Sequence, residues 1–185
     1  MRKVLLAAVL GAAAIGAGPA QALVHLGTFS GTDCQGAGGF SNCYAYQTGG
    51  VSQGQTGGGS PSIFKYNFGG QTDKSSQFAS ITGGEFDFTF DSGANTLAFV
   101  YTPGAGDPEI HYFTVKQADG YALFYDAAAI TSGTIQLSTY FPANPGYSHI
   151  TFFDTGSTPP VPEPASWAMM LTGFFVAWHF YLRRP

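Results

Sequence analysis

The chain has 185 residues, of which 10% are charged, 44% are hydrophobic and 16% are aromatic. This composition excludes a disordered chain, which would carry more charge and fewer aromatic residues, and the length leaves room for one domain between two terminal segments. Ten acidic residues against three lysines give the segment from Leu23 to Pro160 a net charge of −7, so no nucleic acid is expected as a partner.

The N-terminus has the three parts of a secretory signal peptide. A basic start with Arg2 and Lys3 is followed by an apolar, alanine-rich stretch and then by a small-x-small triplet, in which Ala20 and Ala22 mark the cleavage site. This order predicts a signal peptide over residues 1–22 that is removed on export. The alternative is an uncleaved N-terminal anchor, which the cleavable triplet disfavours.

Two cysteines, Cys34 and Cys43, follow in a glycine-rich stretch. In the oxidising compartment that a signal peptide implies, an isolated pair this close predicts a disulfide. Metal binding is the alternative, but a four-ligand site needs partners, and His25 stands alone nearby.

The body of the chain, over residues 23–154, reads as β-structure. Glu85–Asp91 alternates strictly between phenylalanines and polar residues, and Ser62–Phe68 alternates more loosely. Five further runs are rich in strand-forming residues: Leu97–Thr102, Ile110–Lys116, Tyr121–Asp126, Thr134–Tyr140 and Ser148–Asp154. Short strands without an amphipathic helix predict an all-β fold, a single antiparallel β-sandwich that is jelly-roll-like.

Turns and core positions follow from the same pattern. Asp119-Gly120 predicts a tight hairpin, and the glycine-rich segment Thr48–Pro61 predicts a flexible surface loop. The expected core consists of the apolar residues on the inward strand faces: Phe86, Phe88, Phe90, Phe99, Phe113, Phe124, Leu137, Ile150 and Phe152.

Motifs that carry chemistry are not found in this body. No dinucleotide fingerprint, Walker lysine, zinc-protease motif or hydrolase elbow occurs in the sequence, so no catalytic residue, no metal ligand and no cofactor is predicted. Two alternatives stay open for the carboxylates of the Asp87–Glu109 region: a structural Ca²⁺, or a hydrolase that uses two facing acids.

Tyrosines suggest a further alternative. Nine of them lie between Leu23 and Pro160, and a tyrosine presents an apolar ring with a polar tip. A row of tyrosines on an exposed sheet face would make a carbohydrate-binding module for an exopolysaccharide; the ordinary explanation is that they fill half-buried strand faces.

The C-terminus has three parts in a fixed order. A proline-rich linker over residues 155–166 contains Val161-Pro162-Glu163-Pro164, an apolar run follows over 167–182, and Arg183 and Arg184 come next in a basic tail over 183–185. As a helix, the sixteen apolar residues would be ~24 Å long, against roughly 30 Å for a hydrocarbon core. The order predicts a short transmembrane helix, with its arginines held at the cytoplasmic face.

This C-terminal pattern resembles the PEP-CTERM sorting signal of Gram-negative bacteria. The resemblance covers the acidic motif at Val161, Pro162, Glu163 and Pro164, the apolar run and the arginine pair. It implies that the chain is a substrate of exosortase, a transpeptidase-like membrane enzyme that cleaves near the motif. The alternative is an ordinary tail anchor behind a proline-rich linker.

Together these features predict an exported protein that is not an enzyme. We expect it to pause in the inner membrane on its C-terminal helix and then to reach the cell surface or the extracellular matrix. Its expected partners are exosortase, the membrane and, as a candidate, an extracellular polysaccharide of a biofilm, with a structural or adhesive role for the β domain.

Overall fold

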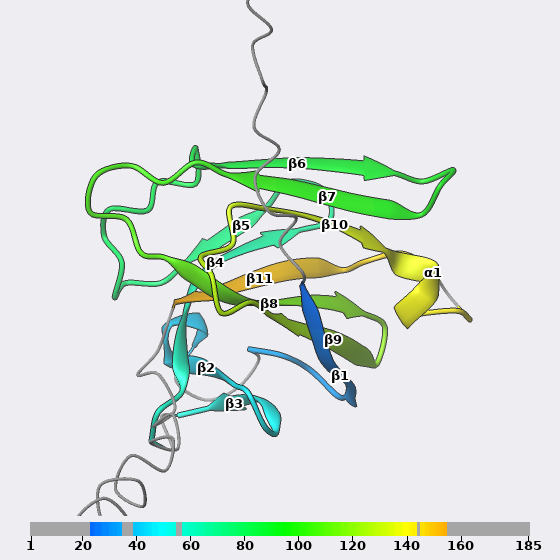
Figure 1. The fold of residues 1–185 in the computed structure, drawn as a ribbon, viewed down its shortest axis with the longest axis horizontal. Helices are drawn as coiled ribbons and strands as arrows, with labels where there is room; N and C mark the ends of the chain where they lie inside the picture. Colours follow the sequence, from blue (N-terminus) through cyan, green and yellow to red (C-terminus); the bar gives the residue numbers. More distant parts are fainter. Residues whose placement is uncertain (1–22, 35–38, 55–56, 144, 155–185) are drawn as a thin grey trace, which may run out of the picture.

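Two antiparallel sheets make up the described part of the chain. The computed structural model describes residues 23–34, 39–54, 57–143 and 145–154 (Figure 1). The larger sheet has the order β1 (Val24–Ser30), β9 (Gly120–Tyr125), β8 (Ile110–Gln117), β11 (His149–Asp154), β4 (Ser60–Asn67), β2 (Cys43–Tyr46) and β3 (Gly50–Gln53), with β5 (Thr72–Lys74) also paired to β4. The smaller sheet has the order β10 (Ser132–Gln136), β7 (Thr96–Tyr101) and β6 (Phe86–Asp91). The short helices are η1 (Phe40–Asn42) and α1 (Leu137–Tyr140).

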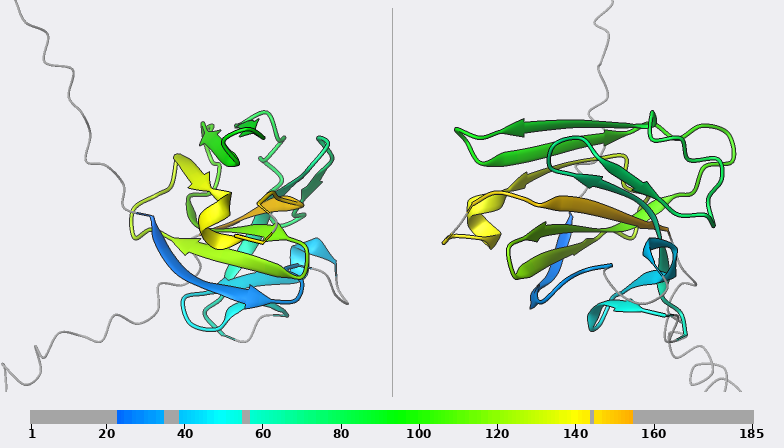
Figure 2. Two further views of the ribbon diagram at one scale, coloured as in Figure 1. Left: turned by 90° about the vertical axis from the view of Figure 1, so that its right-hand side faces the viewer. Right: turned by 180° about the vertical axis from the view of Figure 1, so that it is seen from behind.

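The smaller sheet lies over one face of the larger one, as Figure 2 shows. The predicted all-β, antiparallel, sandwich-like class is therefore confirmed. The division into eight and three strands differs from a jelly roll, whose eight strands form two Greek keys. The physical reason is that β4 is long enough to pair with β11 over most of its length and with β2 at its start, which extends the larger sheet into a nearly closed, barrel-like curl.

Three local predictions differ in detail from the structure. The run predicted as a strand over Thr134–Tyr140 changes at Leu137 into helix α1, where the Leu137 amide donates to the Asn95 carbonyl (2.9 Å). The predicted hairpin is confirmed, but it turns one residue earlier, at Ala118-Asp119, with Gln117 paired to Gly120.

The third difference is in the segment Thr48–Pro61, predicted as a loop, which contains all of β3 and the start of β4. Gly50 explains how a glycine-rich segment fits there. Its φ is +81°, and a Cβ at this position would lie 2.6 Å from the Tyr121 hydroxyl oxygen. The glycine therefore allows the close approach that brings β3 towards β9.

An aromatic ladder closes the sandwich between β4 and β6. Alternate residues of one strand face alternate residues of the other: the rings of Phe64 and Phe86 stack at 4.4 Å, and those of Tyr66 and Phe88 stack at 4.1 Å. The two segments that alternate in the sequence, Ser62–Phe68 and Glu85–Asp91, thus form the two sides of this contact between the sheets. Offset-stacked aromatic pairs add stabilisation beyond their buried area.

The inter-sheet core lies between the two sheets and contains most of the predicted core. Phe88 and Phe90 are partly buried at its margin, while the other seven predicted residues are buried within it. The buried members that we call the inter-sheet core are Ile63, Phe64, Ile81, Phe86, Leu97, Phe99, Tyr101, Ile110, Phe113, Val115, Ala122, Phe124, Ile130, Ile135, Leu137, Tyr147, Ile150 and Phe152.

A second core lies on the opposite face of the larger sheet, inside its curl. We call it the disulfide core; its buried members are Cys34, Cys43, Ala45, Tyr112, Tyr121, Leu123 and Phe153. The same strands supply both cores, because successive side chains of a strand point to opposite faces. In β8, for example, Phe113 belongs to the inter-sheet core and Tyr112 to the disulfide core.

The predicted segments at the two ends are not part of this picture. Within the described ranges, no helix is long and apolar enough to span a membrane. The predicted signal peptide over 1–22, the linker over 155–166, the span over 167–182 and the basic tail lie outside the described residues.

Candidate functional site

The predicted sorting and cleavage residues cannot be placed in the fold, whereas the predicted disulfide can. Ala20, Ala22, the Val161–Pro164 motif, Arg183 and Arg184 lie outside the described residues. The Cys34–Cys43 bond is present, as predicted, with a Cα–Cα separation of 5.1 Å. Both cysteines are buried, so the bond is part of the disulfide core.

A buried polar centre adjoins this disulfide. Asp33, which precedes Cys34, is 1% exposed, and its carboxylate lies among three donors from β8 and β11. The Asp33 Oδ1 atom accepts from His149 Nε2 at 2.6 Å, and Oδ2 accepts from the hydroxyls of Thr114 at 2.5 Å and Thr151 at 3.2 Å. Because a carboxylate only accepts, His149 Nε2 must carry the hydrogen in this pair.

The surroundings of Asp33 fix its charge state. Burial by itself would raise the pKa of the carboxyl group, but the hydrogen bond and the charge of His149, with the hydroxyls of Thr114 and Thr151, outweigh it and hold the pKa below its ordinary value. Asp33 is therefore an ionised, fully partnered group inside the protein.

Lys116 is a second charged group on this face. It pairs with His149 across neighbouring strands, which places the two side chains on the same side of the sheet. Its side chain is buried, and Nζ donates to the Ala118 carbonyl in the β8–β9 turn. The buried carboxylate and the buried ammonium group thus each have a defined partner.

The chemistry of this centre is that of an internal anchor. A histidine–carboxylate pair can orient an imidazole for catalysis, but it then needs a nucleophile and access for a substrate. Here His149 is 5% exposed, and both threonine hydroxyls donate to the carboxylate itself. The arrangement stabilises a charge and ties the segment before Cys34 to two strands.

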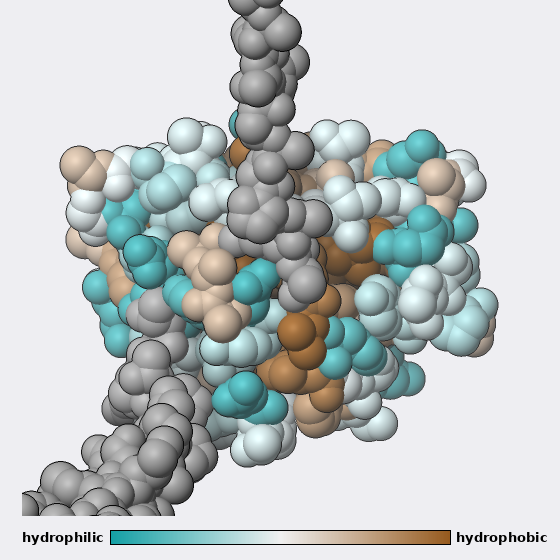
Figure 3. Space-filling view, viewed as in Figure 1, coloured by the Kyte–Doolittle hydropathy of each residue, from teal (hydrophilic) through white to brown (hydrophobic). Residues whose placement is uncertain are grey.

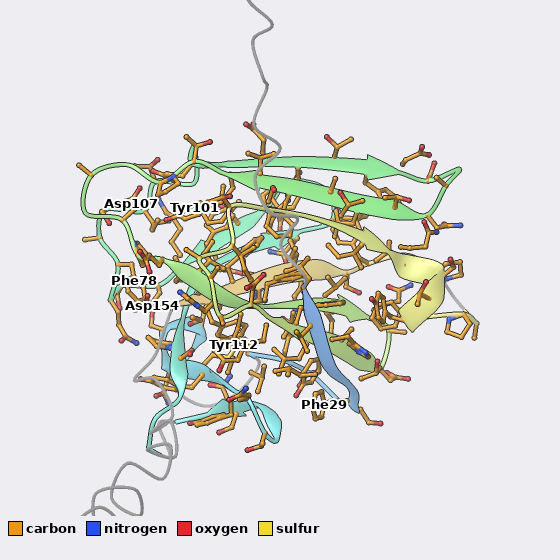
Figure 4. The ribbon with its side chains drawn as sticks, in the orientation of Figure 1. Phe29, Phe78, Tyr101, Asp107, Tyr112 and Asp154 are labelled. Carbon is orange, nitrogen blue, oxygen red and sulfur yellow. A yellow bond between two sulfur atoms is a disulfide. The ribbon has the colours of Figure 1, made fainter. Side chains whose placement is uncertain are left out.

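A group of acidic residues lies at one end of the sandwich. Figure 4 shows the acidic residues Asp107 and Asp154 at this end, together with Tyr101. Burial, with the charges of Asp107, Glu85 and Asp154, raises the pKa of the Tyr101 hydroxyl above its ordinary value. That hydroxyl donates to the Pro108 carbonyl at 2.8 Å. This end of the sandwich is therefore rich in acidic groups, and the Tyr101 hydroxyl already has a partner within the protein.

His111 lies close to this acidic end. Its Nδ1 atom is 2.9 Å from the Asp126 carbonyl oxygen, and its Nε2 atom is 3.6 Å from a Glu109 carboxylate oxygen. His111 Nε2 and Asp126 Oδ2 are buried without a hydrogen-bond partner. Among the residues that the structure describes, however, no three His, Cys, Asp or Glu side chains are arranged to hold a metal ion.

Two of the carboxylates considered for calcium or hydrolysis, those of Asp91 and Asp107, have local partners. Asp91 Oδ1 accepts from the amides of Gly93 (2.8 Å) and Ala94 (3.0 Å), and Asp107 Oδ2 accepts from the Gly104 amide (2.7 Å). These are the bonds by which an aspartate stabilises its own turn.

The tyrosines do not form an exposed row. Four of them, Tyr101, Tyr112, Tyr121 and Tyr147, are buried, and the other five of the β domain are partly buried. Burial, followed by the nearby Tyr125, raises the pKa of Tyr112 to about 12. The ordinary explanation, that these tyrosines fill strand faces, agrees with their positions.

One aromatic ring is well exposed. Phe68, just after β4, is 64% exposed and meets the rings of Phe90 (6.0 Å) and Tyr147 (5.5 Å) edge to face. Elsewhere, on the face shown in Figure 3, apolar residues reach the surface in a narrow band over β1, where Val24 is 50% exposed.

Sequence reasoning missed the buried centre. Asp33 and His149 are 116 positions apart, and each looks like an isolated polar residue in the sequence. One signal was present: Thr114, Lys116, His149 and Thr151 interrupt β8 and β11 at every second position, which marks a polar stripe on one face of adjacent strands.

Comparison of the chain with protein-family models, with curated protein sequences and with solved structures finds no match. Its function must therefore be inferred from its own residues.

Proposed function

We propose that this is an exported protein of the PEP-CTERM type, which exosortase processes at its C-terminus and delivers to the cell surface or the extracellular matrix. The observation that carries the proposal is the order of the C-terminal features: Val161–Pro164, an apolar run and the Arg183-Arg184 pair, in a chain that begins with a signal-peptide pattern. In this proposal the motif residues are recognition elements, and the catalytic groups belong to the enzyme that reads them.

The disulfide supports the export step. Cytosolic thiols are kept reduced, so a buried disulfide is typical of proteins that reach an oxidising compartment. The position of the motif supports the processing step, because Val161 follows the last residue of β11, Asp154, by seven positions. In this proposal, the proline-containing sequence between β11 and the motif lets a membrane enzyme bind the motif without unfolding the sandwich.

For the β domain we propose a structural or adhesive role without catalysis. Its aspartates at Asp33, Asp91 and Asp107 are engaged by partners within the domain, and such bonds stabilise the fold rather than present reactive atoms. A rigid, acidic sandwich suits a matrix component that must persist outside the cell.

Intact mass spectrometry of the protein from its native host tests the sorting proposal. We expect an extracellular species that begins at Leu23, ends near Pro162–Pro164 and is lighter than its reduced form by the two hydrogens of a disulfide. A protein found only in membranes and still carrying residues 167–185 would make the tail a plain anchor and overturn the proposal.

The exposed Phe68 favours a second candidate, a carbohydrate-binding module for an exopolysaccharide. A ring that is 64% exposed and held by Phe90 and Tyr147 offers an apolar face to a sugar. In a polysaccharide pull-down, Phe68→Ala should abolish retention of the protein. Val100→Ala, at a residue that is 48% exposed on the other sheet, is the matched control and should leave it unchanged; equal retention of both variants would remove this candidate.

A further inference from the structure

Two consecutive residues tie the segment that follows β1 to two different parts of the molecule. Asp33 is bonded to His149, Thr114 and Thr151, and so to β8 and β11 of the larger sheet. Cys34 is bonded covalently to Cys43, the first residue of β2. The buried carboxylate and the disulfide are therefore adjacent links of one connection.

Few strand pairings join the ribbon of β2 and β3 to the rest of the larger sheet. Helix η1, just before β2, is bonded to β4 by the Ser62 hydroxyl, which donates to the Phe40 carbonyl at 2.6 Å. β2 pairs with β4 at two positions, Tyr44–Pro61 and Ala45–Ser60. β3 is tied to the opposite side of the curl by the Val51 amide, which donates to the Tyr121 hydroxyl at 2.9 Å. Such short pairing holds a ribbon weakly unless other bonds add to it.

The backbone at Cys34 indicates that the two links are coupled. Its φ is +50°, in the left-handed region that is unfavourable for a residue with a Cβ. A conformation of this kind persists where the surrounding structure over-determines it. Here the bonds of Asp33 fix one side of Cys34, and the disulfide fixes its side chain.

We infer that the Cys34–Cys43 disulfide and the Asp33–His149 pair form one redox-dependent latch that closes the disulfide core. When the cysteines are oxidised, the disulfide at Cys34 holds the neighbouring Asp33 in its place among the three donors. When they are reduced, the carboxylate leaves, and the ribbon of β2 and β3 separates from the sheet. The inference does not depend on the sorting proposal.

The chemical step is thiol–disulfide exchange. A disulfide-containing oxidant takes two electrons and two protons from the Cys34 and Cys43 thiols in two steps, through a mixed disulfide. The oxidant becomes a pair of thiols, and the sulfur–sulfur bond of the latch is formed. Before this step the inter-sheet core is already able to form, because none of its buried members is a cysteine.

Reciprocal linkage gives the first test. If the disulfide favours seating of the carboxylate, then loss of the carboxylate must weaken the disulfide by the same factor. The equilibrium of the full-length protein with a glutathione redox buffer should shift towards the reduced form in Asp33→Asn, by roughly 5- to 150-fold. Ile135→Val, in the inter-sheet core, is the control and should leave this equilibrium as in the wild type.

Circular dichroism will show whether Asp33→Asn still folds. If it does not, Thr151→Val removes one hydroxyl donor while keeping the side-chain shape, and it should shift the equilibrium in the same direction by a smaller factor. An equilibrium unchanged in both variants would overturn the latch.

Hydrogen exchange of the wild-type protein, oxidised and reduced, gives the second test. Reduction should speed exchange of the amides of β2 and β3 while β6, β7 and β10 stay protected. Two results would overturn the inference: unchanged protection of β2 and β3, or equal loss of protection in both sheets, which would make the disulfide a general staple.

Discussion

The two cores of this protein are stabilised in different ways. Among the described residues, the inter-sheet core has eighteen buried hydrophobic members and the disulfide core has seven, two of which are the bonded cysteines. The first can therefore rely on burial of apolar area, which is non-directional and shared among many side chains. The second relies on a few specific bonds, namely one disulfide and the hydrogen bonds of Asp33 and Tyr121.

The two cores are therefore vulnerable to different kinds of substitution. A core of many rings loses stability according to the volume removed and to how well the surrounding side chains can fill the cavity. A core held by single bonds fails when one bond is lost, because the remaining polar groups are then buried without partners. Substitutions in the two cores should therefore differ both in the free energy they cost and in how far along the sheet their effects extend.

Truncation at the centre of the inter-sheet core should have the largest effect. Phe152 is 0% exposed, and its ring meets those of Phe86 and Phe99 at 4.9 Å each. Phe152→Ala should reduce the free energy of unfolding by about 3–5 kcal/mol, measured by urea denaturation. Phe68→Ala, at an exposed ring, should change it by about 0.5 kcal/mol or less; equal losses in the two variants would contradict the assignment of the core.

Neutralising the buried carboxylate should have the next largest effect. In Asp33→Asn an amide replaces the acceptor of three hydrogen bonds, and hydrogen bonds to charged groups contribute about 1.5–3 kcal/mol each. We expect a loss of about 2–3 kcal/mol in urea denaturation at neutral pH. A loss as small as that of a surface variant would show that Asp33 does not anchor the segment after β1.

The same carboxylate predicts an acid dependence. Its pKa is lower in the folded state than its ordinary value of 3.8, so its contribution to stability is complete above that value and is lost as the pH falls through the folded pKa. The free energy of unfolding should therefore fall more steeply below about pH 4 in the wild type than in Asp33→Asn. Parallel curves for the two proteins would contradict a lowered pKa.

Loss of one neutral bond should have a smaller, local effect. Tyr121→Phe removes the hydroxyl oxygen that accepts from the Val51 amide. We expect a loss of about 1 kcal/mol, together with faster hydrogen exchange at Val51 than at amides of the inter-sheet strands. Unchanged exchange at Val51 would show that the bond does not hold β3 in place.

The contrast between the cores also explains what could be predicted from the sequence. The inter-sheet core was predictable where alternation on a strand follows burial, as at Glu85–Asp91. Over Ser62–Phe68 it was not, because Ser62, Ile63 and Phe64 are all buried and Phe68 is exposed. The sequence could not show that these two segments face each other, since pairing between sheets depends on the path of the chain between them.

The disulfide core was predictable only at its two cysteines. Its other contacts join residues far apart in the chain. The polar stripe of β8 and β11 could not be interpreted from the sequence, because its partner Asp33 lies in a distant segment. The glycines around Gly50 suggested flexibility, whereas the structure uses Gly50 for a close approach to Tyr121. Glycine content indicates how flexible the backbone of a segment can be. Only the tertiary fold shows whether that segment forms a mobile loop or a strand.

The smallest effect is expected at an exposed carboxylate that makes a useful comparison with Asp33. Asp73 is 2.7 Å from Lys65 Nζ, and its side chain is 47% exposed. The hydrogen bond from Lys65 outweighs partial burial and lowers the pKa of Asp73, with further help from the charge of Lys65 and from Asn67. Lys65→Met should therefore raise the pKa of Asp73, as measured by carboxyl NMR titration, while changing the free energy of unfolding by about 1 kcal/mol or less.

Added salt should reduce the pKa shift of Asp73 but leave that of Asp33 nearly unchanged, because water and ions screen only the exposed pair. If salt moved both titrations equally, Asp33 would have to be accessible to solvent, and the disulfide core would not be closed.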